Sequence, residues 1–295
     1  MELRVLQYFL AVTREQSISG AAESLHLSQP TLSRQLKDLE EELGKKLMIR
    51  GSRKITLTEE GMLLRKRAEE IFDLVQKTEN EISISGDIIS GDISIGTGET
   101  DGMRLISQIA KKLRSAYPQV CFHIYSGNAS YVIEQLDHGL IDFGLIFSPF
   151  DHSKYDFVAL PPKDNWGVLM RRDSELANKK QLTPEDLFDK PLIISQEEKK
   201  HDIIAKWLKC DFENLDIAAT YNLIFNASLM VDEGLGYAIC LDNIINVSGN
   251  SSLCFKPLFP KLELEMKIIW KKYHVFSKAS AKFLAFLKDQ YAYFH

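Results

Sequence analysis

A short run of polar and basic side chains at the start of one predicted helix has the chemistry needed to read base pairs. Ser28 is a good N-cap, and Pro30 falls in the first helical turn, where a missing N–H costs little. Leucines then recur at spacings of four and three, which predicts one buried face. Such side chains at a helix N-terminus match the edges of bases in a major groove. We predict DNA contacts from Ser28, Gln29, Pro30, Thr31, Ser33, Arg34 and Lys37.

Basic residues continue directly after this helix. Lys45, Lys46, Arg50, Arg53 and Lys54 fall within ten residues that contain no acid, and a short alternating strand follows them. A charge run by itself is often only a solvated face. Placed after a helix-turn-helix, it fits a basic β-wing along the phosphate backbone, and we expect Arg50, Arg53 and Lys54 to contact phosphates.

Two further elements must position this helix and hairpin. Residues 2–14 carry an apolar stripe that predicts a first helix packed beneath the helix-turn-helix. Ala21 and Ala22 are small enough for a second helix to pack closely. We therefore expect a winged helix-turn-helix domain over residues 1–57.

The next segment, residues 58–87, is predicted to be a linker helix, from Thr58 to about Ser85, followed by a hinge. Its apolar positions step by three and four residues, which is a heptad pattern. The helix could pack on its own domain, but a strict seam favours a coiled coil between two chains. The predicted dimer contacts are Leu64, Ala68, Ile71, Val75 and Ile82.

From residue 88 to residue 295 the pattern changes to alternating strands and helices, which predicts an α/β domain with a parallel sheet. We expect one lobe over about 91–160 and 268–295 and a second over about 161–267. Thr183 to Asp186 has the composition of a helix start. Strands are predicted at 91–96, 120–125, 141–147, 165–171, 192–195, 215–220, 237–240 and 263–271, and helices at 101–117, 129–138, 203–208, 223–233 and 277–293.

These features together resemble the LysR-type transcriptional regulators. The N-terminal motifs are Ala21-Ala22, Ser28-Gln29-Pro30, Leu39-Glu40, Leu47-Met48-Ile49-Arg50 and Leu57-Thr58-Glu59-Glu60-Gly61, with Met48 in place of the usual Phe. Weaker marks follow at Gly91 to Gly96, Pro118 to Val120, Gly139 with Asp142 and Gly144, Pro191 to Ile193, and Gly234 to Gly236. The resemblance implies a type 2 periplasmic-binding-protein fold that senses a small effector between two lobes.

The predicted effector site is formed by loops at the ends of strands, where open α/β sheets bind ligands. A helix N-terminus at this edge favours an anion, so we expect a polar, carboxylate-bearing effector, although Glu99 adds a negative charge. The resemblance implies effector contacts at Thr100, Asn128 and Ser195. The full predicted lining is Gly98, Glu99, Thr100, Ser126, Asn128, Phe147, Ser148, Ser195, Gln196 and Asn222.

Other chemistry has little support in the sequence. Asp101 stands where a dinucleotide loop needs its third glycine, and the histidines show no HExxH or other metal spacing. We expect no catalytic residues, metal or cofactor. The cysteines, Cys121, Cys210, Cys240 and Cys254, sit among apolar neighbours and are predicted to be buried thiols, with a redox-sensing pair as the alternative.

Bulk properties agree with a DNA-binding regulator. The chain has 295 residues and a net charge of −5, so the positive charge that DNA needs must be local. Residues Arg4, Arg14 and Glu15 interrupt any signal-peptide core, and no apolar run approaches a membrane span, which predicts a cytoplasmic protein.

We therefore expect a regulator that binds a pseudo-palindromic operator as a homodimer or a homotetramer of paired dimers. A small molecule would modulate that binding, and RNA polymerase would be a partner if the protein activates transcription. The alternatives are a plain solute-binding protein and a cleft enzyme fused to a DNA-binding domain.

Overall fold

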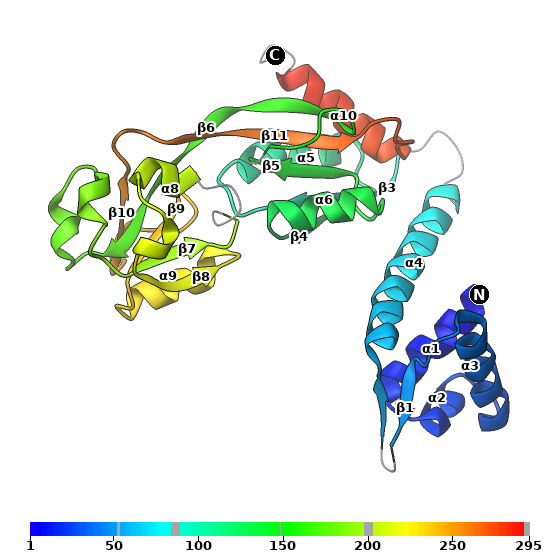
Figure 1. Ribbon diagram of the computed structural model, residues 1–295. Coiled ribbons are helices and arrows are strands. Elements are labelled where there is room, and N and C mark those ends of the chain that lie inside the picture. The colour runs from blue at the N-terminus through cyan, green and yellow to red at the C-terminus, as the bar shows by residue number, and fades with distance from the viewer. Residues whose placement is uncertain (52–53, 84–88, 148, 198–202, 292–295) are drawn as a thin grey trace. The chain divides into compact units, whose positions relative to one another are not determined.

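The computed structural model describes residues 1–51, 54–83, 89–147, 149–197 and 203–291. Contacts divide the chain into two units, Met1–Ser83 and Ile84–His295, which are described separately (Figure 1). None of the described helices has both the length and the hydropathy needed to cross a lipid bilayer.

The first unit is a helix-turn-helix with a wing. Its core is formed by apolar side chains of the first three helices and the hairpin, including the fully buried Phe9, Val12 and Leu36. Met48 belongs to this core, so the substitution at the family's Phe position is accommodated by packing. The elements are α1 (Leu3–Glu15), α2 (Ile18–Ser24), α3 (Gln29–Leu43), β1 (Met48–Arg50), β2 (Ile55–Leu57) and α4 (Glu59–Ser83).

One buried carboxylate fastens the wing to α3. Glu40 Oε1 accepts the backbone N–H groups of Leu47 at 2.8 Å and Met48 at 3.3 Å, and Oε2 lies 3.0 Å from Lys46 Nζ. Burial acts to raise the pKa of Glu40, but these donors outweigh it and the pKa is lowered. The ionised carboxylate is therefore part of the fold, and it fixes the position of β1 relative to α3.

The linker helix α4 packs on its own domain at its start. A Cβ at Gly61 would lie 2.0 Å from the carbonyl oxygen of Leu47, so only glycine allows this approach. Leu64 packs against the core of the first unit, whereas Leu74 and Ile82 are exposed. Ala68 is buried, and Ile71 and Val75 are half-buried.

The second unit is built on one nine-stranded sheet with the order β4-β3-β5-β11-β6-β9-β7-β8, and β10 pairs with β6. Strands β3, β4 and β5 of one lobe pair in parallel, as do β7, β8 and β9 of the other, as predicted, whereas β6, β10 and β11 pair antiparallel with their neighbours. The two lobes form separate apolar cores. The strands are β3 (Gly91–Thr97), β4 (Val120–Ser126), β5 (Phe143–Ile146), β6 (Tyr155–Arg171), β7 (Leu192–Ser195), β8 (Ile217–Tyr221), β9 (Tyr237–Leu241), β10 (Leu253–Pro257) and β11 (Glu263–Lys271). The α-helices are α5 (Met103–Ala116), α6 (Ala129–Asp137), α8 (Ile203–Leu208), α9 (Ile224–Asp232) and α10 (Lys278–Tyr291).

Two antiparallel strands, β6 and β11, run from one lobe into the other (Figure 1). Their pairing is regular from Tyr155 to Leu160, resumes at Asp164, and shifts register between Leu264 and Met266. Because no other strand pairs in both lobes, this crossing holds the two lobes as one unit in the described structure.

The sequence-based prediction of elements was wrong in three places. Strand β6 begins at Tyr155 rather than at Asn165, and Pro161 and Pro162 lie where its ladder with β11 is interrupted. The segment after Thr183 forms one 3-10 turn over Pro184–Asp186, with its capping box complete, rather than an α-helix. Strand β10 was not predicted.

We predict that Glu40→Ala lowers the free energy of unfolding of the first unit by about 2–4 kcal/mol, because two buried N–H groups lose a charged acceptor. Since the folded pKa of Glu40 is lowered, this stabilisation is present at neutral pH and is lost as pH falls through the folded pKa. Denaturant titrations of the full chain at several pH values measure it. Glu41→Ala, an exposed acid on the same helix, should change little; an equal loss in both variants would contradict the role of Glu40.

Candidate functional site

The first turn of α3 presents an exposed polar surface. Ser28 caps the helix by accepting the Thr31 N–H at 3.3 Å, and Gln29, Pro30 and Thr31 are exposed. Ser33 is half-buried. This arrangement leaves the predicted base-reading positions, except Ser33, free of the domain core.

Two basic side chains extend that surface along the helix. The Arg34 side chain is 83% exposed and lies 4.0 Å from Asp38, and Lys37 lies 3.2 Å from Glu41. Exposed pairs of this kind contribute little to stability. Both cations are therefore available to exchange their carboxylate partners for DNA.

The wing is a two-stranded hairpin in which Met48 pairs with Leu57. Gly51 N–H donates to the carbonyl oxygen of Lys54 at 3.1 Å, and Lys54 is exposed. Arg53 and the side chain of Arg50 lie outside the described residues, so their phosphate contacts stay predictions.

In the second unit, a cavity of about 100 Å³ lies between the lobes. Both lobes contribute its walls, from the ends of β3, β4 and β5 on one side and from β7, β8 and β9 on the other. Six of the predicted effector residues line this cavity, namely Gly98, Glu99, Asn128, Phe147, Ser195 and Asn222.

The remaining predicted residues lie elsewhere. Thr100 and Ser126 line an adjacent, open groove beside α5, which shares Gly98, Glu99 and Ile244 with the cavity. Gln196 is exposed and does not line the cavity. Ser148 lies outside the described residues. The structure thus does not place Thr100 and Ser195 around one cavity.

Most of the cavity wall is apolar. The sequence analysis predicted Phe147 but missed the rest of the apolar wall, because it considered only loops at the ends of strands. Trp166 on β6 and Leu264 on β11 line it from the crossing strands. Trp166 Nε1 is buried and has no hydrogen-bond partner within the described residues. An unpaired buried donor is costly and calls for an acceptor. The other apolar lining residues include Leu145, Ile146, Tyr221, Ile224, Cys240, Leu241 and Ile244.

Two hydrogen bonds cross from one lobe to the other beside this cavity. The Glu99 carboxylate accepts the backbone N–H of Ile224, the first residue of α9. Ser130 on α6 donates to Glu197 Oε1 at 3.3 Å. Glu99 therefore occupies the positive end of α9, whereas the sequence analysis expected the ligand carboxylate at the start of a different helix, the one predicted over 101–117.

Several polar groups of the lining serve local structure. Asn128 caps α6 by accepting the Tyr131 N–H at 2.9 Å, and Asn222 Oδ1 accepts the Leu223 N–H at 2.9 Å. Ser195 Oγ accepts the Glu197 N–H at 3.3 Å, which leaves its hydroxyl proton available to a ligand.

Thr100 supports the crossing strand. Helix α5 begins at Met103, after Thr100, and the Thr100 hydroxyl donates to Asp164 Oδ2 at 2.6 Å and accepts the Gly102 N–H at 2.9 Å. Burial raises the pKa of Asp164, and the carboxylates of Asp242 and Asp101 add to the rise while Thr100 opposes it.

The cysteines correct one expectation. Cys121 is exposed on β4, and Cys210 and Cys254 are only partly covered; Cys240 alone of the four is buried. All four thiols are free. Burial raises the pKa of Cys240 to about 12.

We predict that Asp164→Asn increases the free energy of unfolding at neutral pH by about 1 kcal/mol, since it removes a buried charge but keeps an acceptor for Thr100. Because the folded pKa of Asp164 is raised, its penalty is absent below about pH 3.9 and grows as pH rises to the folded value. Thermal unfolding of the variant should thus match the wild type in acid and exceed it near neutrality. Asp216→Asn, an exposed change in the same unit, is the control; a lower melting temperature for Asp164→Asn at neutral pH would refute the argument.

Comparison with known proteins gives a consistent result. The family model described as "Bacterial regulatory helix-turn-helix protein, lysR family" matches residues 3–62, and the model "LysR substrate binding domain" matches residues 87–292. A hydrogen peroxide-inducible genes activator of Dickeya chrysanthemi is 30% identical over 198 residues, which is 67% of this chain and only 64% of that protein. The HTH-type transcriptional regulator YwbI of Bacillus subtilis is 28% identical over 98% of this chain and 96% of its own length.

Solved structures share the fold over the whole chain. The LysR family transcriptional regulator CbnR has a TM-score of 0.76 at 19% identity and covers 99% of both chains. Full-length CbnR complexed with its target DNA has a TM-score of 0.74 at 20% identity, over 98% of this chain and 99% of that one.

Proposed function

We propose, since this chain belongs to the LysR family of DNA-binding transcriptional regulators, that a small molecule in the interlobe cavity modulates its binding to an operator. The observation that supports this proposal is the cavity itself, whose walls come from both lobes and are joined by the Glu99–Ile224 contact. A ligand that touches both lobes binds the closed arrangement better than an open one. Such a difference in affinity is what shifts a conformational equilibrium.

The cavity lining favours an effector with an apolar body and a hydrogen-bond donor. The charged side chains among the described lining residues are Glu99 and Glu197, both acidic. Glu99 also occupies the start of α9, which disfavours the carboxylate-bearing effector expected from the sequence. An acceptor on the ligand could satisfy the Trp166 indole. Since a dry cavity of about 150 Å³ holds benzene, a single ring with one polar group is near the right size.

We predict that small ring-bearing amines raise the melting temperature of the wild-type chain and that their carboxylic-acid analogues do not. Benzylamine and benzoate are a suitable matched pair. Glu99→Gln should weaken amine binding about tenfold or more, because a charge-assisted hydrogen bond contributes about 1.5–3 kcal/mol. Thermal shift and calorimetry measure both effects.

Glu213→Gln, an exposed change in the second unit, is the control for that experiment and should bind like the wild type. Stabilisation by benzoate that strengthens in Glu99→Gln would mean that Glu99 competes with an anionic effector. Unchanged binding in Glu99→Gln would place the effector outside this cavity.

For DNA recognition, we propose that the first turn of α3 reads bases and that the wing holds phosphates. The support is the exposed surface formed by Gln29, Thr31 and Arg34 and the exposed Lys54 of the wing. An operator with two half-sites requires two recognition helices, so we propose a homodimer that can pair into a tetramer. The exposed Leu74 and Ile82 on α4 are candidates for the contact between the two chains.

We also propose that the regulator acts in the cytoplasm, with RNA polymerase as a partner if it activates transcription.

We predict that Arg34→Ala costs about 1–3 kcal/mol at the cognate operator and broadens sequence preference. Lys54→Ala should weaken binding to all sequences about equally and reduce the salt slope by about one. Salt-dependent anisotropy with cognate and scrambled duplexes separates the two effects. Arg104→Ala, an exposed arginine in the second unit, is the control; if Arg34→Ala weakened both duplexes equally, base reading would belong elsewhere.

A response to peroxide, suggested by the name of the Dickeya relative, has weaker support. Cys240 lines the cavity, but burial raises its pKa to about 12, so it is protonated at neutral pH. A protonated thiol is neither a good nucleophile nor an easily oxidised group. Reversible binding of a small molecule therefore fits this cavity better than thiol chemistry or catalysis.

A further inference from the structure

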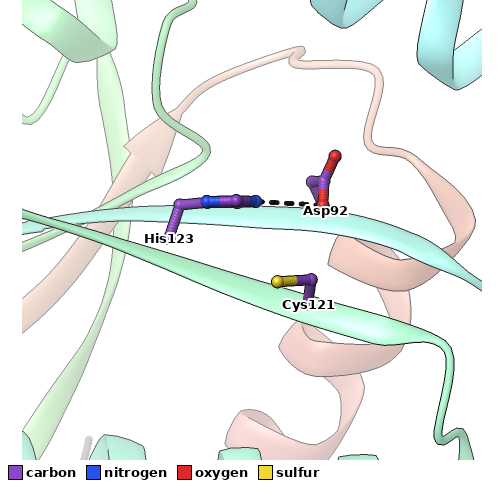
Figure 2. A group of neighbouring side chains, drawn as sticks. All are labelled: Asp92, Cys121 and His123. Carbon is purple, nitrogen blue, oxygen red and sulfur yellow. Dashed lines mark hydrogen bonds and ion pairs between the residues drawn. The ribbon is translucent and has the colours of Figure 1, made fainter.

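Three side chains with different ligand atoms meet on the outer strands of the first lobe. Asp92 on β3 is paired directly with Cys121 on β4, and His123 follows two residues later on β4, opposite Ser94. The thiol, imidazole and carboxylate atoms all lie within 4.8 Å of one another. His123 Nε2 lies 3.0 Å from Asp92 Oδ1. Figure 2 shows the three side chains together, with this contact as a dashed line.

The alternation of strand β4 explains why these groups face solvent. Phe122 packs on Phe283 of α10, with ring centroids 5.8 Å apart. Cys121 and His123, on either side of Phe122, therefore point to the opposite face, since successive side chains of a strand alternate. The side chains of His123 and Asp92 are 44% and 49% exposed, and Cys121 is exposed as well.

We propose that Asp92, Cys121 and His123 form a binding site for a divalent metal ion of the zinc type. Thiolate, imidazole and carboxylate are the ligands that zinc takes in proteins, at roughly 2.0–2.3 Å, and tetrahedral ligands then lie roughly 3.4–3.7 Å apart. The three groups need only small side-chain rotations to reach that spacing. On binding, the Cys121 thiol releases its proton to solvent, and two anionic ligands then balance the charge of the ion.

The three ligands are held on a rigid backbone, and the fourth coordination position of a bound ion is open. Two hydrogen-bonded parallel strands supply all three ligands, so the backbone needs no reorganisation. The fourth position faces solvent and is open to water. Asp92 directly follows Gly91, the first residue of β3, so a bound ion would tie the start of the second unit's sheet to its edge strand.

The sequence analysis predicted no metal site because it looked for ligands at short spacing along one segment. Asp92 reaches its partners only through the pairing of β3 with β4. Cys121 and His123 are two residues apart on one strand, so both side chains lie on the same face of the sheet. This spacing was the local signal of a metal site in the sequence.

Titration of the full chain with cobalt(II), in the presence of a non-thiol reductant, tests the site directly. We expect one cobalt ion per chain, with the near-ultraviolet absorption of a cobalt–thiolate bond and the visible bands of a tetrahedral site, both removed by zinc. Cys121→Ser should abolish the thiolate absorption, and His123→Ala should weaken cobalt binding by more than about tenfold. Zinc should also slow alkylation of Cys121 by iodoacetamide.

The matched control is Cys254→Ser, which removes another partly exposed thiol and should leave the cobalt spectrum unchanged. Cys121 and His123 are exposed, and Cys254 is partly covered and packs against the core of the second lobe. An unchanged melting temperature of the full chain would show that the variants fold. The proposal is overturned if the thiolate absorption is absent, if it survives Cys121→Ser, or if it is lost in Cys254→Ser. A cobalt spectrum that does not change in His123→Ala would also overturn the proposal, because it would show that Asp92, Cys121 and His123 do not form the site together.

Discussion

The antiparallel pairing of β6 with β11 is the constraint on which the second unit depends. Each strand is hydrogen-bonded in both lobes, and their ladder is interrupted where it passes from one lobe to the other. Trp166 and Leu264 lie beside that interruption, on its second-lobe side, and form walls of the cavity. Asp164 lies at the same place, buried, and receives the Thr100 hydroxyl. The position of the cavity is therefore a consequence of how two strands cross, and the loops only complete its rim.

Two buried carboxylates show how the surroundings of an acid decide its role. Glu40 receives two backbone N–H groups and lies against Lys46, so its pKa is lowered and its charge stabilises the fold. Burial raises the pKa of Asp164 and two other acids add to the rise, so its charge destabilises the fold although one hydroxyl donates to it. The difference lies in the donors and in the neighbouring charges: two backbone N–H groups and a cation face Glu40, whereas one hydroxyl and two anions face Asp164.

Local signals made the DNA-binding unit predictable. The Ser28 cap, the Pro30 position and the leucine spacing all act within one helix, and α3 begins at Gln29 as they indicate. The effector cavity depended on contacts between distant segments, such as Glu99 with Ile224, which no local pattern reveals. Cys121 is instructive because its apolar neighbours suggested burial. On a strand at the edge of the sheet, those neighbours point inward and Cys121 points outward.

The energetics of the interlobe contact limit what the effector must supply. A charged hydrogen bond such as Glu99 with Ile224 contributes about 1.5–3 kcal/mol. Changing a two-state equilibrium from 1:99 to 99:1 needs about 5.5 kcal/mol of differential binding. One polar contact therefore cannot provide a full switch. At about 25 cal/mol per Å², the same 5.5 kcal/mol would need burial of about 220 Å² of apolar surface in the closed state only. A cavity walled by Trp166, Phe147 and Leu264 can provide contacts of that kind. In this arrangement the polar groups select the ligand's orientation, and the apolar walls supply most of the free energy that closes the lobes.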